Sequence, residues 1–257
     1  MGQQNEITTT STNGLNSPRN PFEIQSMFSR IAPRYDLLNR LMTFGMDRIW
    51  RKDMVRILPF NQEKLRFLDL ATGTGDVAFA IFKEWENRTL TYKEHYPQID
   101  ALDFSLPMIV RAKEKAKKKQ LDHHLHFHCI PLEEMPFSEN TFDGATIAFG
   151  IRNVRDPKRG LMKIFKVLKP KAPLIILEAL PPNNILKRLI QRMHMDLTVR
   201  LLGNLLSEGQ AYRYLGNSVG NFPQAKDFLN QMEEEGFQNC QYKSLSGGAV
   251  ALLWGYK

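Results

Sequence analysis

The sequence predicts an α/β fold built on a mostly parallel β-sheet. Short apolar segments alternate with amphipathic helical segments along the middle of the chain, as in repeated strand–helix–strand units. Strands are expected near residues 65–70, 98–104, 124–130, 143–149 and 173–180, and helices near 76–87, 106–120 and 157–168. Near the end of the chain, segments 238–245 and 249–256 flank Ser246, Gly247 and Gly248, which predicts a hairpin and an antiparallel final strand.

Segments outside this alternating core complete the expected organisation. Residues 1–20 are polar and are expected to form a disordered tail, whereas residues 21–257 are expected to form one domain. Within that domain, residues 21–60 are expected to form a helical cover and residues 185–215 a helical insertion near the substrate pocket. The amphipathic part of the insertion, 185–206, is interpreted as a helix docked on the core, a lid over an apolar pocket, or a helix lying on a membrane.

Two aspartates mark expected helix starts. Asp47 precedes an apolar stripe that includes Trp50 and Met54, and Asp156 is followed by Pro157. Both aspartates are expected to be N-caps, because their side chains can accept hydrogen bonds from the free amides of a first helical turn.

The composition limits the classes of protein that the chain can be. Its 257 residues carry a net charge of +8, which favours a polyanionic partner or an anionic membrane surface. The two cysteines, Cys129 and Cys240, form neither a metal motif nor a disulfide framework, and no segment is apolar enough to span a membrane. A cytoplasmic location is therefore expected, with peripheral contact to the inner face of a membrane as a further expectation.

A turn that contains two glycines follows the first expected strand. Asp69 lies at the end of that strand, and Gly73, Thr74 and Gly75 form the turn before a helix. Glycine lets a ligand approach the backbone closely, and the first turn of a helix presents unpaired N–H groups. The turn therefore predicts a site for a nucleotide-like cofactor, of which P-loop nucleotides, dinucleotides and S-adenosylmethionine are the three candidates.

The neighbouring residues favour S-adenosylmethionine. Gly75 is followed by Asp76 rather than lysine, which excludes a P-loop. The turn satisfies the dinucleotide pattern, but the next acid, Asp103, comes later than is usual in dinucleotide sites, and Asp76 would repel a pyrophosphate. In an S-adenosylmethionine site, Asp69 can hold the methionine amino group, and Asp103 can accept hydrogen bonds from both ribose hydroxyls.

Several motifs together resemble the ubiquinone/menaquinone biosynthesis C-methyltransferases, a family of class I S-adenosylmethionine-dependent methyltransferases. The most family-specific stretch is Ala148-Phe149-Gly150-Ile151-Arg152-Asn153-Val154. Residues 28–39, 41–51, 69–76, 103–108, 212–215 and 248–257 also match, so the resemblance covers nearly all of 22–257. It implies a Rossmann-like sheet of seven strands with the last strand antiparallel, and an enzyme that methylates a carbon of a reduced, prenylated quinone.

The resemblance also implies which residues bind the cofactor. Contacts are expected at Asp69, Gly73, Thr74, Gly75, Asp103, Phe104, Pro131, Leu132 and Ala148. Pro131 and Leu132 stand where the family usually has a small polar or acidic residue followed by alanine, and Pro131 offers adenine neither an N–H nor a side-chain acceptor. Either Glu133 or Glu134 replaces that acceptor, or the adenine is held more weakly.

Methylation of a ring carbon requires an electron-rich ring, and a hydroquinone becomes one when a phenolic O–H is deprotonated or polarised. Arg152 is expected to stabilise the phenolate, and Asn153 to orient the oxygen or a water. The alternative is that both residues only cap their turn. Tyr35 and Asp36 in the helical cover are expected to help close the pocket, and His194 is a further candidate base. No metal is required.

The family resemblance favours demethylmenaquinol as substrate, with a polyprenyl-methoxy-benzoquinol of ubiquinone biosynthesis as the alternative. A nucleic-acid methyltransferase would suit the positive charge. However, neither the Asn/Asp-Pro-Pro-aromatic turn of the amino-group enzymes nor a cysteine next to proline occurs in the sequence. His124, His126 and His128 alternate along an expected strand, but no carboxylate completes a metal shell at the usual spacing. The expected partner is a lipophilic prenylated hydroquinone, and no nucleic acid is expected.

Overall fold

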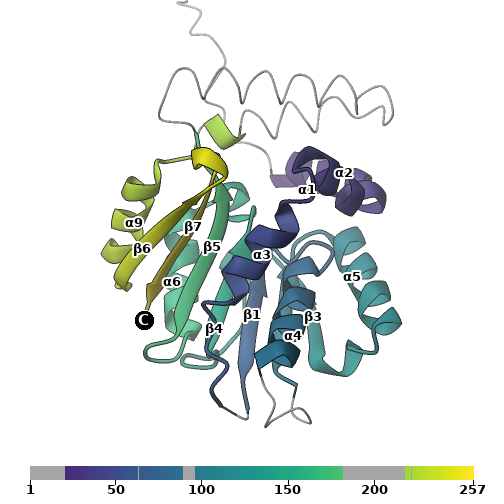
Figure 1. Ribbon diagram of the computed structural model, residues 1–257, viewed down its shortest axis with the longest axis horizontal. Coiled ribbons are helices and arrows are strands. Elements are labelled where there is room, and N and C mark those ends of the chain that lie inside the picture. Colours follow the sequence, from purple (N-terminus) through teal and green to yellow (C-terminus); the bar gives the residue numbers. More distant parts are fainter. Residues whose placement is uncertain (1–20, 63, 89–95, 182–217, 221) are drawn as a thin grey trace, which may run out of the picture.

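A seven-stranded sheet forms the centre of the computed structural model, which describes residues 21–62, 64–88, 96–181, 218–220 and 222–257 (Figure 1). The strand order is β3-β2-β1-β4-β5-β7-β6. The strands are β1 (Arg66–Leu70), β2 (Gln98–Asp103), β3 (Leu125–Cys129), β4 (Gly144–Ala148), β5 (Pro173–Ala179), β6 (Gln238–Leu245) and β7 (Val250–Tyr256). Strands β1 to β5 pair in parallel, and β7 is antiparallel to both β5 and β6. The predicted sheet, including its antiparallel last strand, is confirmed.

Helices cover both faces of the sheet. On one face, α3 (Asp47–Val55) and α4 (Asp76–Arg88) pack in a core cluster that contains Phe67 of β1. On the other, α6 (Pro157–Val167) and α9 (Ala225–Glu234) pack in a cluster that contains the next residue, Leu68. Because successive strand residues point to opposite faces, the full burial of both side chains explains why the central strands read as continuous apolar runs.

The helix starts follow the sequence prediction in one case and depart from it in another. Asp156 caps α6, since its carboxylate accepts a hydrogen bond from the amide of Arg159 at 3.0 Å. The expectation that Asp47 caps α3 is wrong: α3 begins at Asp47 itself, and its N-cap residue makes no side-chain bond. The Asp47 carboxylate pairs instead with Arg51, one turn further along, at 2.9 Å. The Thr43 hydroxyl accepts the Asp47 N–H at 3.4 Å.

A helical cover lies across the carboxyl ends of the parallel strands (Figure 1). It consists of α1 (Pro21–Ile31), the 3-10 turn η1 (Ala32–Arg34) and α2 (Tyr35–Met42), and α3 leads from it onto the sheet. Gln25 of α1 donates a hydrogen bond to the carbonyl of Phe104 at 2.6 Å. The hydroxyls of Ser29 and Ser105 lie 3.2 Å apart. The cover is thus fastened to the loop between β2 and α5 (Leu106–Lys118).

The C-terminal hairpin contacts α3, the helix that leads from the cover onto the sheet. Trp50 of α3 donates a hydrogen bond from its indole nitrogen to the Ser246 hydroxyl at 3.1 Å. Lys243 of β6 forms an ion pair with Asp53 of α3 at 3.3 Å. The end of the chain therefore holds a helix that lies near its beginning.

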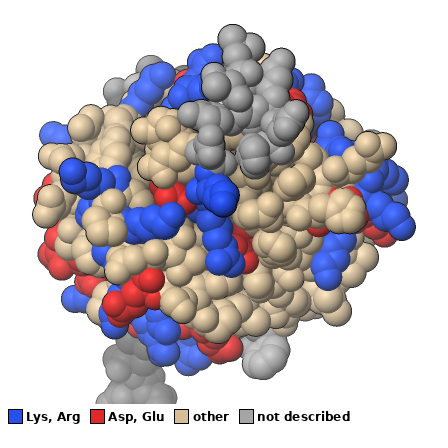
Figure 2. All heavy atoms as spheres, turned by 90° about the horizontal axis from the view of Figure 1, so that it is seen from below, with Lys and Arg blue, Asp and Glu red and all other residues tan. Residues whose placement is uncertain are grey.

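Three further expectations can be compared with the described residues. The net charge is not gathered on the face seen from below in Figure 1, where basic and acidic side chains are mixed among uncharged ones (Figure 2). None of the described helices is long and apolar enough to cross a bilayer. The helical insertion at 185–215, with His194 and the family motif at 212–215, lies outside the described residues.

The histidine series does not form a metal site. His124 and His126 each lie within hydrogen-bond distance of Gln98, at 3.2 and 3.0 Å. His128 pairs with Asp100 at 2.8 Å. Within the described part of the chain, no three histidine, cysteine or carboxylate side chains gather in a way that could hold a metal ion.

Candidate active site

Asp69, near the end of β1, is fully buried without a cationic partner. Its carboxylate accepts hydrogen bonds from the hydroxyls of Thr72, at 2.5 Å, and Thr146, at 2.9 Å. Burial raises the pKa of Asp69 from its ordinary value of 3.8 to about 6, although both hydroxyls oppose the shift. Among the described residues, no lysine or arginine pairs with this carboxylate. The site would therefore favour a bound cationic group beside Asp69.

Asp103, the last residue of β2, joins its strand to the glycine turn. One carboxylate oxygen accepts the N–H of Gly73 at 2.9 Å, and the other accepts the N–H of Ser105 at 2.8 Å. Burial raises the pKa of Asp103 to about 6, and the two amides oppose the shift. Each oxygen keeps a lone pair, so Asp103 can accept two further hydrogen bonds from a diol.

The glycine turn needs its glycines. Gly73 and Gly75 have φ angles of +56° and +86°, a conformation that other residues rarely adopt. A Cβ at Gly75 would lie 3.0 Å from the Phe79 ring, and a Cβ at Gly73 would lie 3.7 Å from Tyr35 Cε1. Tyr35 therefore lies close to the turn. Its expected role in closing the pocket stays a prediction.

Charged groups on other elements of the site affect the pKa of Tyr35. Burial raises the pKa of Tyr35, while its hydrogen bond with Asn39 and the positive charges of Arg152 and Arg51 oppose that rise. Geometry supports the same arrangement. Tyr35 lies close to Gly73, and Gly150, directly before the η4 turn, approaches Ala71 at the start of the glycine turn.

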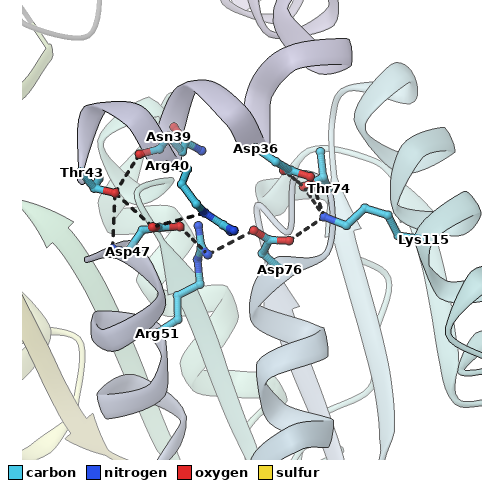
Figure 3. Close-up of polar contacts among 9 residues, drawn as sticks. All are labelled: Asp36, Asn39, Arg40, Thr43, Asp47, Arg51, Thr74, Asp76 and Lys115. Atoms are coloured by element: carbon cyan, nitrogen blue, oxygen red, sulfur yellow. Dashed lines mark hydrogen bonds and ion pairs between the residues drawn. The ribbon is translucent and has the colours of Figure 1, made fainter. Parts of the chain in front are cut away.

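A continuous series of charged contacts connects the cover to the glycine turn (Figure 3). In order, the contacts are Arg40–Asp47 (4.0 Å), Asp47–Arg51 (2.9 Å), Arg51–Asp76 (3.1 Å), Asp76–Lys115 (2.5 Å) and Lys115–Asp36 (2.9 Å). Thr74, in the turn, donates to Asp36 at 2.5 Å and lies 3.0 Å from the Lys115 amine. We call this series the charge chain. It connects helices α2, α3, α4 and α5 around Thr74.

The charge chain changes one argument made from the sequence. Burial alone would raise the pKa of Asp76, but the charges of Arg51 and Lys115 outweigh that effect and lower it. Asp76 is therefore ionised but compensated by two cations. Its charge is a weaker argument against a pyrophosphate than the sequence suggested, and the choice of cofactor depends instead on Asp69 and Asp103.

Arg152 forms a buried ion pair that sequence reasoning missed. It lies in the 3-10 turn η4 (Ile151–Asn153), and its guanidinium is hydrogen-bonded to Glu178 of β5. The side chains are 6% and 0% exposed. Burial raises the pKa of Glu178, and the charge of Arg152 opposes this. Within the described residues, Arg152 Nε and Glu178 Oε2 are buried and have no hydrogen-bond partner.

The only sequence signal for Glu178 is an acidic residue directly after the apolar run 174–177. The η4 turn itself is held tightly against the sheet. A Cβ on Gly150 would lie 2.5 Å from the Cβ of Ala71, so the close approach requires glycine. Asn153 is half-buried in the same turn, and its amide donates to the Gly150 carbonyl at 3.0 Å.

The remaining predicted cofactor residues lie around the same edge of the sheet. Ala148 is half-buried at the end of β4, and Phe104 follows Asp103. Pro131 is exposed, whereas Leu132 is buried and would lie 3.1 Å from a Cβ on Gly160 of α6. Leu132 is thus partly a packing residue.

Glu133 is already bonded elsewhere. One of its carboxylate oxygens accepts the amides of Arg155 and Asp156, at 3.0 and 3.4 Å. Of the two acids expected to replace the adenine acceptor, Glu134 is the exposed one. The parallel register places Cys129, the last residue of β3, opposite Asp103, so this loop does adjoin the end of β2.

The geometry fits S-adenosylmethionine. Asp69 is a buried carboxylate without a counter-cation, which suits an ammonium group. Asp103 has free acceptor capacity, which suits a ribose diol, and it is joined to the glycine turn by the amide of Gly73. When bound, S-adenosylmethionine supplies an electrophilic methyl group. Arg152 and Asn153 lie in the turn after β4, and Tyr35 lies close to Gly73.

Comparisons with known proteins identify relatives of this chain. The family model described as the ubiE/COQ5 methyltransferase family matches residues 15–257. The chain is 37% identical to a ubiquinone/menaquinone biosynthesis C-methyltransferase UbiE of Geotalea daltonii, over 91% of this chain and 96% of the relative. It is 35% identical to the protein of the same name from Rickettsia bellii, over 91% and 92%.

Solved structures share the fold at low sequence identity. A SAM-dependent methyltransferase from Aquifex aeolicus superposes with a TM-score of 0.55 at 16% identity, covering 93% of this chain and 98% of the other. The [4+2]-cyclase SpnF superposes with a TM-score of 0.60 at 17% identity, covering 93% and 97%. Since these proteins have different chemistry, this likeness establishes the class I methyltransferase fold alone.

Proposed function

The chain belongs to the ubiE/COQ5 methyltransferase family, and from this premise we propose that it converts demethylmenaquinol to menaquinol. It is a C-methyltransferase of quinone biosynthesis, and its methyl donor is S-adenosylmethionine. The single observation that carries the proposal is the family match over nearly the whole chain. The alternative substrate is a polyprenyl-methoxy-benzoquinol, because the name of the relatives covers both pathways.

We propose that the cofactor lies between Asp69, Asp103 and the glycine turn. Asp69 binds its amino group, Asp103 its ribose hydroxyls, and the turn from Gly73 to Gly75 approaches it closely. Phe104, Ala148, Pro131 and Leu132 line the adenine and methyl ends. The support for this assignment is the burial of both carboxylates and the hydrogen bond from Gly73 to Asp103.

We propose that Arg152 stabilises the phenolate of the bound quinol. Its Nη1 is paired with Glu178, whereas its Nε is buried without a partner among the described residues, so Nε is one donor that could serve a ring oxygen. Asn153 orients the same oxygen or a water, and Tyr35 closes the site above the glycine turn. Loss of the phenolic proton makes the ring carbon nucleophilic. That carbon would form a bond to the methyl group as the sulfur–methyl bond of the donor breaks and leaves a neutral thioether. The hydrogen of the ring carbon would then leave as a proton to water.

Glu178 acts in this proposal as a positioning residue. An arginine side chain has several rotamers, and the carboxylate that pairs with its guanidinium selects one of them. Because Glu178 also accepts the amide of Ala179 at 2.9 Å, the carboxylate is itself fixed to the end of β5. The pair is therefore a rigid support for Nε rather than a mobile charge.

Product analysis with defined substrates tests the proposal. The purified protein would be incubated with labelled S-adenosylmethionine and, separately, with demethylmenaquinol, the methoxy-benzoquinol and RNA. Methylated menaquinol is expected as the main product, and no label should enter RNA. Arg152→Lys should lose most of the activity, whereas Lys226→Ala on the exposed face of α9 is the matched control. Preferential labelling of the benzoquinol or of RNA would overturn the assignment.

The expected contact between helix 185–206 and an anionic membrane concerns residues outside those described and stays a prediction. Charge reversal at Lys187, Arg188 and Arg192 should weaken co-sedimentation with anionic vesicles. Binding that is unchanged by these substitutions would count against that helix.

A further inference from the structure

The outer side of the helical cover carries an unusual group of exposed apolar side chains. Nine large apolar residues are exposed among the described residues, and five of them lie within the short stretch between residues 37 and 49. We call them the cover patch: Leu37 (58% exposed), Leu41 (46%), Phe44 (82%), Met46 (37%) and Ile49 (61%). Exposed apolar residues that are scattered singly need no explanation, but a cluster of this kind indicates an interaction surface.

The local structure explains why these side chains point outward. Leu37 and Leu41 are four residues apart on α2, whereas Leu38, between them, is 4% exposed and faces the core. Asp36 and Arg40, on the inner side of α2, point toward the glycine turn and α3 (Figure 3). Phe44 follows in the turn between α2 and α3. The inner face of the cover therefore serves the site, and its outer face carries the patch.

Exposed basic side chains flank the cover patch. Arg34, Arg48 and Lys52 are exposed beside the patch, and within the described residues none of them pairs with a carboxylate. Arg34 lies one turn before Leu37, and Arg48 and Lys52 flank Ile49 along α3. The acids of this stretch, Asp36 and Asp47, are turned inward into the charge chain. The outer surface is thus apolar and basic.

We propose that the cover patch docks this protein on the surface of an anionic phospholipid bilayer. Apolar side chains enter the boundary between headgroups and acyl chains, and flanking cations bind anionic headgroups, as in interfacial helices. The cover lies over the carboxyl ends of the strands, which is also the edge that carries the site (Figure 1). Docking through the cover would bring that edge to the membrane. The inference rests on the proposed function in that a prenylated substrate is dissolved in the bilayer.

A flotation assay with the full chain tests the inference. Vesicles of phosphatidylcholine alone are compared with vesicles that also contain phosphatidylglycerol, at low and high salt. The wild-type protein should bind the anionic vesicles and be released as salt rises. The double variant L41Q/F44Q, and separately the charge variant R34Q/R48Q/K52Q, should each lower the apparent affinity at least tenfold. All substituted residues are exposed, and circular dichroism would verify that both variants are folded.

A matched control uses exposed apolar residues that lie outside the cover. Met162 of α6 and Tyr242 of β6 are 44% and 40% exposed, and M162Q/Y242Q should bind vesicles like the wild type. Equal loss in this control, or no vesicle binding by the wild type, would overturn the inference. So would a change in oligomeric state of L41Q/F44Q at unchanged vesicle binding, because the patch would then be an interface between copies of the chain.

The design separates this inference from the proposed function. With a short-chain, water-soluble quinol, the patch variants should keep wild-type methyl transfer, since no patch residue belongs to the site. With substrate in anionic vesicles, their rate should fall along with binding. Vesicle binding without transfer to any quinol would refute the function and leave the docking surface intact. Normal transfer from vesicles by L41Q/F44Q would refute the docking surface alone.

Discussion

Replacement of Asp69 by asparagine should make the cofactor-free protein more stable and, at the same time, weaken cofactor binding. Raising the pKa of a carboxyl from 3.8 to about 6 corresponds to about 3 kcal/mol at a pH where the group is ionised. Asparagine avoids this cost and can still bond to Thr72 and Thr146, because each hydroxyl can accept as well as donate. We expect the free energy of unfolding to rise by about 1–3 kcal/mol at pH 7.5, because weaker hydrogen bonds to asparagine offset part of the gain.

The sign of the pH dependence follows from the raised pKa. The folded protein binds the Asp69 proton more tightly than the unfolded chain does, so this contribution to stability is full below pH 3.8 and is lost as pH rises through about 6. The difference between Asp69→Asn and the wild type should therefore be large at pH 7.5 and small near pH 4.5. Urea unfolding at both pH values, followed by circular dichroism, would measure it.

Asp103→Asn is the contrasting variant. The Asp103 carboxylate has a similarly raised pKa, but both of its oxygens accept hydrogen bonds from backbone N–H groups. A backbone N–H can only donate, so it cannot adapt to a donor placed opposite it. The asparagine amide nitrogen would face one of these donors, so we expect little gain in stability or a loss of about 1 kcal/mol.

Calorimetry should find S-adenosylmethionine bound about 10- to 100-fold more weakly by Asp69→Asn, through loss of a charge-assisted bond. An Asp69→Asn protein no more stable than the wild type at pH 7.5 would refute the reasoning.

Three further predictions concern other parts of the site. Glu178→Gln leaves Arg152 buried without its counter-charge, so kcat should fall about 100-fold while the cofactor Kd stays nearly unchanged. Glu178→Asp should recover part of the lost kcat, and equal losses in both variants would indicate a purely structural role. Lys115→Met removes the cation shared by two carboxylates of the charge chain, so hydrogen exchange in α2 should accelerate, and unchanged protection would contradict a fastening role. Gly150→Ala should destabilise by about 1–3 kcal/mol in thermal unfolding, while Gly220→Ala, whose Cβ meets nothing within 4 Å, should not; similar effects of both would argue against tight packing at η4.

Much of the fold could be predicted from the sequence because its pattern is local. Strands buried on both faces read as short apolar runs, and each helix between them has its own stripe, so the observed boundaries differ from the predicted ones by no more than two residues. The positions of Asp69 and Asp103 followed from the same logic, since parallel strands bring their carboxyl ends to one edge.

The contacts that could not be predicted depend on distant or competing partners. Lys115 meets Asp36 across 79 positions in the sequence, and no pattern in α5 distinguishes it from the lysines around it. The capping role expected of Asp47 failed because α3 begins at Asp47 itself, and the carboxylate pairs with Arg51 one turn later. Glu178 carried only a weak signal, and its pairing with Arg152 required the register of β4 and β5.

The bond between Trp50 and Ser246 has a consequence for how the fold assembles. It joins residues that are 196 positions apart, so α3 gains this contact only once the hairpin of β6 and β7 has paired with the sheet. Contacts between distant parts of a sequence form slowly during folding. Disruption of the hairpin should therefore loosen α3 as well, although the two segments are remote in sequence.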